Sequence, residues 1–146
     1  MRFMEKAVIV QQAQQEHAPS TLDFAMDLVH WAEDKKAENI HLYEVGDLCS
    51  YADYVLICSG NSDRHVSAIA EILREEGKHA GHIPLGVEGL HKAHWVLLDF
   101  GDVVVHIFLG PVRDYYDLDR LWPAKAKIWS GGEPASTPES EDDDDL

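Results

Sequence analysis

The regular pattern of the chain begins near residue 20, where apolar residues recur at the spacing of one helix face. Ser20 followed by Asp23 resembles a capping box with the shorter acid. Charged residues return over 33–36, so the pattern predicts a helix that begins at Ser20–Thr21 and fades there. The apolar face of this helix is expected to contain Leu22, Ala25, Met26, Val29 and Ala32.

Two further segments have a helical pattern. The first spans Asp63–Lys78, with Asn61 or Ser62 as its N-cap and with Val66, Ile69, Ala70 and Leu73 facing inward. The second begins at Pro111, where the missing N–H of proline costs little, and its apolar and aromatic residues run to Trp122 before Pro123. The aromatic residues Tyr115, Tyr116 and Trp122 are most simply interpreted as the stripe by which this helix docks.

Alternating and continuous apolar runs predict the strands. Residues 39–45 alternate, and residues 53–58 form a nearly continuous apolar run, which is typical of a strand buried on both faces. Residues 82–85 are expected to form a short strand parallel to 53–58 through a right-handed crossover. Residues 86–93 are expected to form a loop.

The stretch 95–108 predicts a β-hairpin, because two apolar runs flank Asp99-Phe100-Gly101-Asp102. With Phe100 and Gly101 as the turn, the expected cross-strand pairs are Leu98–Val103, Leu97–Val104, Val96–Val105 and Trp95–His106. Alternation then places only apolar side chains on one face, which is the expected core face: Val96, Leu98, Val103, Val105 and Ile107.

The other face of the hairpin mixes apolar and polar groups, which is unusual for a core and suits a recognition surface. Its members are Trp95, Leu97, Asp99, Asp102, Val104, His106 and Phe108. In this register Asp99 lies opposite Asp102, and like charges directly across a ladder repel. The simpler interpretation of these two aspartates is that they cap the solvated end of the hairpin.

The elements add up to an α/β fold, with a mixed sheet of about five strands and flanking helices. The 146 residues divide into an N-terminal extension (1–19), one domain (20–122) and an acidic tail (123–146) that is expected to be disordered. Within the extension, Ala7–Val10 is a candidate short strand.

The net charge of −15 restricts the partners of the domain. The last fourteen residues carry seven acids and no base, and the remaining chain is acidic in its own right. An acidic body repels phosphate backbones, so direct nucleic-acid binding is not expected, whereas basic proteins are favoured as partners. The sequence shows no signal peptide or membrane span, and Cys49 and Cys58 are expected to be free thiols in a cytoplasmic protein, with Cys58 packed in a strand.

The junction between residues 58 and 66 could bind phosphate at a helix N-terminus. Its candidate residues are Asn61, Asp63, Arg64 and His65. A metal-dependent nucleotidyltransferase needs paired carboxylates to hold its metals, and here only Asp63 is acidic. The same residues are also those of an ordinary helix cap.

Metal and cofactor sites are not expected. The nine histidines include the pairs His79/His82 and His91/His94, but they lie in or beside loops and no Cys or carboxylate cluster completes a site. No nucleophile-elbow sequence is present. The sequence therefore offers no catalytic residue, no metal site and no cofactor.

Several motifs, in order and at family spacing, resemble the Iojap family of ribosomal silencing factors. They are Lys36–Ile40, Ala52–Tyr54, Ser59–Val66, Pro84–Gly89, Trp95–His106 and Tyr116–Trp122, and the resemblance covers about Leu22 to Trp122. Asp119 stands where the family more often has Glu, and the extension and the tail lie outside the pattern.

The resemblance implies a nucleotidyltransferase-like fold without activity. It also implies binding to the large ribosomal subunit through ribosomal protein L-fourteen, which keeps the small subunit from joining and lowers translation. Family members are often homodimers. The acidic domain suits a basic ribosomal protein, since electrostatic steering speeds encounter.

The first hypothesis is therefore a non-catalytic translation repressor. Trp95 and Leu97 would be apolar anchors, His106 would support the indole, and the acids that pair with basic groups would be Glu88, Asp99 and Asp102. The alternatives are a nucleotidyltransferase or nucleotide-binding domain that uses Ser59–Asp63, and a dimeric scaffold whose mixed face is only its self-interface.

Overall fold

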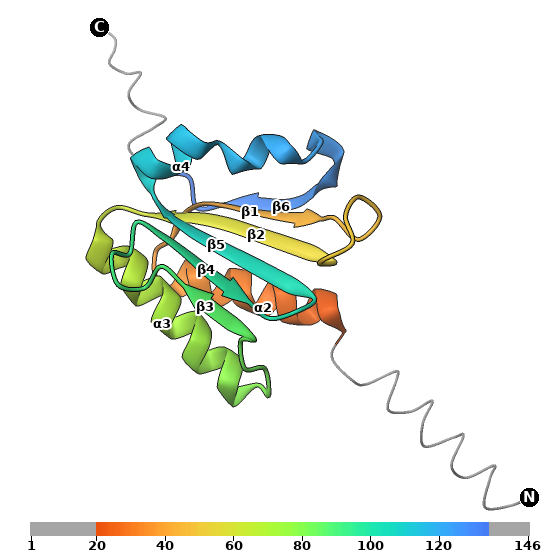
Figure 1. Cartoon of the computed structure of the whole chain (residues 1–146), viewed down its shortest axis with the longest axis horizontal. Helices are drawn as coiled ribbons and strands as arrows, with labels where there is room; N and C mark the ends of the chain where they lie inside the picture. The colour runs from red at the N-terminus through yellow and green to blue at the C-terminus, as the bar shows by residue number, and fades with distance from the viewer. Residues whose placement is uncertain (1–19, 135–146) are drawn as a thin grey trace, which may run out of the picture.

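The computed structural model describes residues 20–134, so the candidate strand at Ala7–Val10 and the end of the tail lie outside the described residues. The described elements form one mixed sheet with helices against both of its faces (Figure 1). No helix among these residues is long and apolar enough to cross a membrane.

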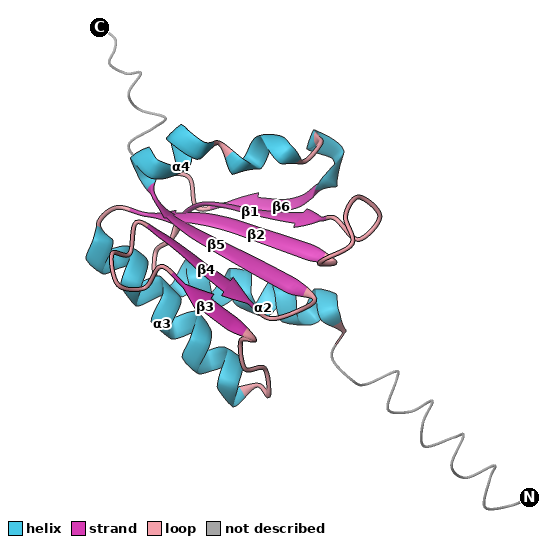
Figure 2. Cartoon of the chain, viewed as in Figure 1, coloured by secondary structure: helices cyan, strands magenta, loops and turns pink. Residues whose placement is uncertain are grey.

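Six strands lie in the order β3-β4-β5-β2-β1-β6. The strands β2 (Tyr54–Gly60) and β5 (Val103–Leu109) pair in parallel at the centre, and all other neighbours are antiparallel (Figure 2). The outer strands are β1 (Glu38–Glu44), β3 (Gly86–Glu88), β4 (Trp95–Asp99) and β6 (Lys127–Gly131). The expected mixed α/β sheet is confirmed, with one strand more than the sequence predicts.

The two long helices cover one face of the sheet. The helix α2 (Thr21–Asp34) has the expected capping box between Ser20 and Asp23, and α3 (Asp63–His79) is capped by the Ser62 side chain. Both helices bury most of their expected apolar faces, but Leu22, which was expected on the inner face of α2, is exposed. The core that the helices form with the sheet includes the expected hairpin residues Val96, Leu98, Val103, Val105 and Ile107. Cys58 is fully buried in this core, and burial raises the pKa of its thiol to about 12, which fits its expected packing role.

A second, smaller core lies on the opposite face. The short helix α4 (Gly110–Tyr116), the 3₁₀ turns at Leu118–Leu121 and Ala124–Ala126, and Trp122 cover part of the sheet. Figure 1 shows this covering segment on the side of the sheet away from α2 and α3. The buried residues of the second core are Tyr43, Val45, Val55, Ile57, Phe108 and Ala126.

The hairpin has its expected faces but a different register. Gly101 and Asp102 form the turn, with Gly101 at φ +92°, and Trp95 pairs with Phe108 instead of His106. Phe100 stays in register as the partner of Val103 because its ring packs edge-on against Phe24 at 5.1 Å. The pairing thus moves by two positions, and an even shift leaves every side chain on its expected face.

The segment expected as a strand at 82–85 is irregular, and the strand lies at Gly86–Glu88, inside the expected loop. Pro84 cannot donate to a ladder, and Ile83 and Leu85 are exposed. The new strand β3 pairs antiparallel with β4, so the parallel neighbour of β2 is β5.

The C-terminal part also differs from expectation. The helix expected to run from Pro111 to Trp122 ends at Tyr116, because Asp117 takes a left-handed conformation with φ +51°. Tyr115 and Tyr116 are exposed and do not dock into the core. The strand β6 lies within the range assigned to the disordered tail and pairs with β1 through Trp129 and its neighbours, so the folded domain extends past residue 123.

Candidate functional site

The mixed face of the hairpin is only half covered. The alternation placed Val104 and Phe108 on the mixed face that suits a recognition surface. Phe108 is fully buried and Val104 is only 7% exposed, so neither is part of an open surface. Trp95 and Leu97 on β4 are partly buried. The second core stops at these residues because α4 and the turns after it lie over β5, β2 and β1 and not over β3.

The open part of this face brings two residues of the predicted hairpin, Leu97 and His106, together with Glu88, which was expected in the loop before it. Glu88, Leu97 and His106 are direct cross-strand neighbours on β3, β4 and β5. Side chains opposite each other on adjacent strands share one face, so an exposed carboxylate, a half-buried leucine and an imidazole form one row. Asp99 lies two residues from Leu97 on the same face, whereas Asp102 is exposed in the turn.

Trp95 is fixed in this surface by contacts on several sides. Its indole Nε1–H donates a hydrogen bond of 3.1 Å to Nδ1 of His106. Its ring stacks on Phe108 with centroids 4.9 Å apart, and it meets Tyr116 of α4 at 4.7 Å. Because so many contacts hold the indole, its partly exposed edge is presented in a defined orientation.

The hydrogen bond from Trp95 also determines the protonation of His106. The acceptor Nδ1 has to be free of a proton, and burial lowers the pKa of this imidazole to about 4, against a smaller opposing effect of the Asp119 charge. His106 is therefore neutral near pH 7. It acts as a fixed acceptor for the indole.

The two aspartates at the hairpin end do not face each other. Asp99 pairs with Val104, and its Oδ1 accepts a hydrogen bond of 2.8 Å from the N–H of Gly101. The Asp102 carbonyl accepts from the N–H groups of Asp53 and Tyr54 at the start of β2. Asp99 thus stabilises the turn, as in the simpler interpretation of the sequence, and the carboxylate of Asp102 is exposed.

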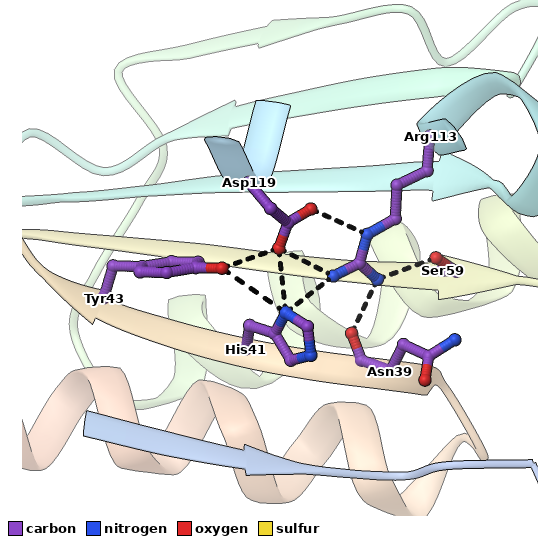
Figure 3. A network of polar contacts seen from close by, with 6 residues as sticks. All are labelled: Asn39, His41, Tyr43, Ser59, Arg113 and Asp119. Atoms are coloured by element: carbon purple, nitrogen blue, oxygen red, sulfur yellow. Dashed lines mark hydrogen bonds and ion pairs between the residues drawn. The ribbon is translucent and has the colours of Figure 1, made fainter. Parts of the chain in front are cut away.

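A polar network that the sequence analysis missed lies beside this surface, centred on Arg113 of α4 (Figure 3). The Arg113 side chain is 8% exposed, and its Nε and Nη2 donate to the two carboxylate oxygens of Asp119 at 3.1 and 3.0 Å. Its Nη1 donates to the carbonyl of Asn39 at 2.6 Å and to Oγ of Ser59 at 2.9 Å. One guanidinium therefore joins α4, β1, β2 and the turn after α4.

Two further side chains complete the network around Asp119. The Tyr43 hydroxyl donates to Oδ2 at 2.8 Å, and Nδ1 of His41 lies 2.8 Å from the same oxygen. Burial by itself would raise the pKa of the Asp119 carboxyl, but hydrogen bonds from His41, Arg113 and Tyr43 and the Arg113 charge lower it well below its usual range. Burial and the Asp119 contact raise the pKa of Tyr43, so this hydroxyl keeps its proton and remains a donor.

No local pattern marks Arg113 as buried. Its partners Asn39, His41 and Ser59 lie 54 to 74 residues away along the chain. The sequence carries only an indirect signal, since Asn39, Ser59 and Asp119 each lie within one of the motifs that resemble the family. The network stabilises the covering segment, because its donors and acceptors are satisfied internally.

The secondary candidates at the start of α3 are arranged as a helix cap. The Asn61 N–H donates to Nδ1 of His65, so the proton of this imidazole lies on Nε2, which donates to the Lys35 carbonyl at 2.8 Å. His65 thereby ties the beginning of α3 to the end of α2. Asp63 and Arg64 are exposed on the first turn of the helix, and the structure does not bring them to the hairpin face.

The serine that the nucleotidyltransferase alternative would use is buried and bound to another residue. Ser59 is 3% exposed and its hydroxyl accepts from Arg113. Within residues 20–134, no group of three His, Cys, Asp or Glu side chains is placed to hold a metal ion. The junction after β2 is therefore described by capping and packing.

The fold and this surface define a class: a small α/β domain with a mixed sheet, one face of which is partly left open around a fixed tryptophan. The family model for "Ribosomal silencing factor during starvation" (RsfS) matches residues 15–145. The chain belongs to this RsfS/Iojap family of ribosomal silencing factors.

Individual relatives agree with this assignment. The chain is 44% identical over 90 residues to the ribosomal silencing factor RsfS of Bacillus subtilis, covering 62% of this chain and 76% of the relative. A mouse protein named "Mitochondrial assembly of ribosomal large subunit protein 1" is 31% identical over 114 residues, which cover 76% of this chain and 50% of the mouse protein. A crystal structure of a Chromobacterium violaceum protein superimposes with a TM-score of 0.70 at 34% identity, covering 82% of this chain and 98% of that one.

Proposed function

We propose that this member of the ribosomal silencing family is a non-catalytic, cytoplasmic translation repressor. In this proposal it binds the large ribosomal subunit through ribosomal protein L-fourteen and prevents the small subunit from joining. The contact surface is the open half of the hairpin face. Its anchors are Trp95 and Leu97, its supporting residue is His106, and its acids are Glu88, Asp99 and Asp102.

The single observation that carries the proposal is the way Trp95 is held. An aromatic side chain that is fixed by His106, Phe108 and Tyr116 but still partly open has already lost the conformational freedom that binding would otherwise cost. Tryptophan is also enriched among the residues that dominate binding energy at protein interfaces. The row from Leu97 to Glu88 extends this anchor toward the edge of the sheet.

Charge supports a ribosomal protein as the partner. The chain carries a net charge of −15, which repels RNA and attracts basic proteins. Glu88 is exposed opposite Leu97, and Asp102 is exposed in the turn at the end of the hairpin, so both can pair with lysine or arginine. The name of the mouse relative refers to the ribosomal large subunit, which supports this choice of subunit.

A subunit-joining assay tests the proposal. Purified large subunits are incubated with the chain, small subunits are added, and the fraction of joined ribosomes is measured by light scattering. We expect the chain to lower this fraction and to sediment with large subunits that contain L-fourteen. Unchanged joining would refute the proposal.

The same preparation separates the alternatives. A chain that sediments as a dimer and ignores large subunits would be a scaffold whose hairpin face is its self-interface. Calorimetric titration with nucleoside triphosphates and Mg²⁺ tests the nucleotide-binding alternative, for which we expect no heat of binding. In the repressor proposal, a dimer formed through the hairpin face has to dissociate when the large subunit is added.

A further inference from the structure

Three aromatic rings form a corner beside the open hairpin face. Tyr116 meets Trp95 with centroids 4.7 Å apart, and Tyr115 stands nearly perpendicular to Tyr116, at 5.0 Å and 89°. We call Trp95, Tyr115 and Tyr116 the aromatic corner. The corner continues the stack of Trp95 on Phe108, so a series of rings leads from the buried core to the surface.

The corner is open to solvent. Tyr115 is 81% exposed and Tyr116 is 53% exposed, which is unusual for two neighbouring aromatic residues on a short helix. A hollow of about 410 Å³ lies against them and is lined by His94, Trp95, Pro111, Val112, Tyr115 and Tyr116. Packing within the domain therefore leaves the outer ring, Tyr115, with no structural role beyond its contact with Tyr116.

Hydrogen bonds at α4 and just before it hold the residues that line the hollow in place. Arg113, between Val112 and Tyr115 on α4, anchors the helix to Asn39 and Ser59 of the sheet. The Leu109 N–H, just before α4, donates to the His94 carbonyl at 2.8 Å. Rings on a helix that is fastened at both of these points present a preformed surface, which lowers the entropic cost of binding.

We propose that the aromatic corner binds one cationic side chain, a lysine or arginine, of the basic protein that docks on the hairpin face. The inference rests on the proposed function and extends its contact surface across α4. Ring faces carry negative potential, and a cation within about 6 Å of a ring centre is attracted to it. Two rings at about a right angle allow one cation to meet both.

The chemistry of the surroundings favours a cation over an apolar side chain. Asp114 and Asp117 are exposed on either side of the tyrosine pair along the chain; they line the neighbouring pocket around Arg113, where Asp117 also pairs with Arg120. The whole chain is strongly acidic, so a basic side chain is drawn to this region while an apolar one gains nothing from the charge. Arginine is also enriched at the cores of protein interfaces.

Substitutions at Tyr115 test the inference, because a side chain that is 81% exposed can be replaced with little effect on folding. Affinity for purified large subunits is measured for the full chain and for Tyr115→Phe, Tyr115→Leu and a series of fluorinated phenylalanines at position 115. The phenylalanine variant keeps the ring, whereas leucine keeps the apolar volume without the π face. We expect Tyr115→Phe to bind within two-fold of the wild type and Tyr115→Leu about five-fold more weakly.

Fluorination gives the sharper readout. Each added fluorine weakens the negative potential of the ring face with a small change in size, so affinity should fall stepwise along the series. Tyr51→Leu, at an exposed tyrosine in the β1–β2 connection, is the matched control and should bind like the wild type.

The possible failures are distinguishable. Wild-type affinity of Tyr115→Leu, or equal losses for leucine and phenylalanine, would overturn the aromatic corner while leaving the proposed function intact. Unchanged affinity along the fluorination series would indicate that the partner side chain at the corner is apolar and not cationic, which would also overturn the inference. Absence of binding by the wild-type chain would overturn the proposed function itself.

Discussion

Arg113 and Asp119 meet as a two-point pair, with Nε 3.1 Å from Oδ1 and Nη2 3.0 Å from Oδ2. They are six residues apart, on opposite sides of the left-handed Asp117 at which α4 ends. The pair therefore closes the bend in the segment that covers part of the sheet. Since Trp95 packs against this covering segment through Tyr116, the pair also supports the candidate binding surface.

Removing the guanidinium should strongly destabilise the domain. Arg113→Ala leaves Asp119 without its charged partner and Ser59 without its buried donor, and the free energy of unfolding should fall by about 3 kcal/mol. Urea denaturation followed by circular dichroism measures this change. The matched control is Arg120→Ala, whose exposed pair with Asp117 should contribute less than about 1 kcal/mol. Similar losses in the two variants would contradict the assigned role of the network.

Acid should destabilise the domain through His106. The pKa of this imidazole is lowered from 6.5 to about 4 in the folded state, so the unfolded chain takes up a proton at a higher pH than the folded one. Stability contributed by the neutral imidazole is complete above pH 6.5 and is lost as pH falls from 6.5 toward 4. His106→Gln cannot titrate, so its stability should change less over this range.

The imidazole pKa can be measured directly by following the ring carbon-bound protons of His106 in NMR spectra. A folded-state value near 6.5 would show that the imidazole is not held neutral by its surroundings. Wild type and His106→Gln should then lose stability in parallel on acidification.

The turn that enters β4 should not tolerate a side chain at Gly89. This residue has φ +87°, and an added Cβ would collide with the carbonyl oxygen of Trp95. Gly89→Ala should lower the free energy of unfolding by about 3 kcal/mol. Gly86→Ala is the control, because a Cβ at Gly86 meets nothing within 4 Å and its φ is not positive. Thermal unfolding of the two variants distinguishes them.

Loss of the indole should weaken binding to the large subunit. Trp95→Ala removes the fixed anchor, and the cost should be about 2 kcal/mol or more, a loss of roughly thirty-fold in affinity. Co-sedimentation of the full chain with purified large subunits measures it. Tyr51→Ala serves as the control, because Tyr51 is exposed three residues before β2, whose first residues lie at the opposite end of the strands from Trp95. Wild-type affinity in a folded Trp95→Ala variant would remove Trp95 from the binding surface.

Local sequence pattern predicted the elements whose side chains alternate or repeat clearly. Ser20 and Asp23 define the start of α2, and the apolar residues of the hairpin fall on the expected core face. The hairpin register was wrong by two positions because a remote contact, Phe100 against Phe24, decides which residues turn. The alternation of apolar and polar residues carries no information about such a contact.

The remaining differences have the same origin. The strand β6 is mostly exposed and pairs with β1 far upstream, so residues 127–131 show no local strand pattern. The left-handed Asp117 ends α4 without a glycine to signal it. Arg113 is buried because partners on β1 and β2 satisfy it, and residue type alone predicts an exposed arginine. The hairpin part of the candidate surface could thus be predicted, whereas its support from α4 could not.

The shortness of β3 has a consequence for how assemblies can form. A guest strand arriving at that side would find only Gly86–Glu88 to pair with, directly before the sharp bend at Gly89. Lateral growth of the sheet is therefore discouraged there, as in many domains that resist aggregation. A partner that associates with this end of the molecule therefore has to bind side chains on the face of the sheet, because it cannot add a strand to the edge.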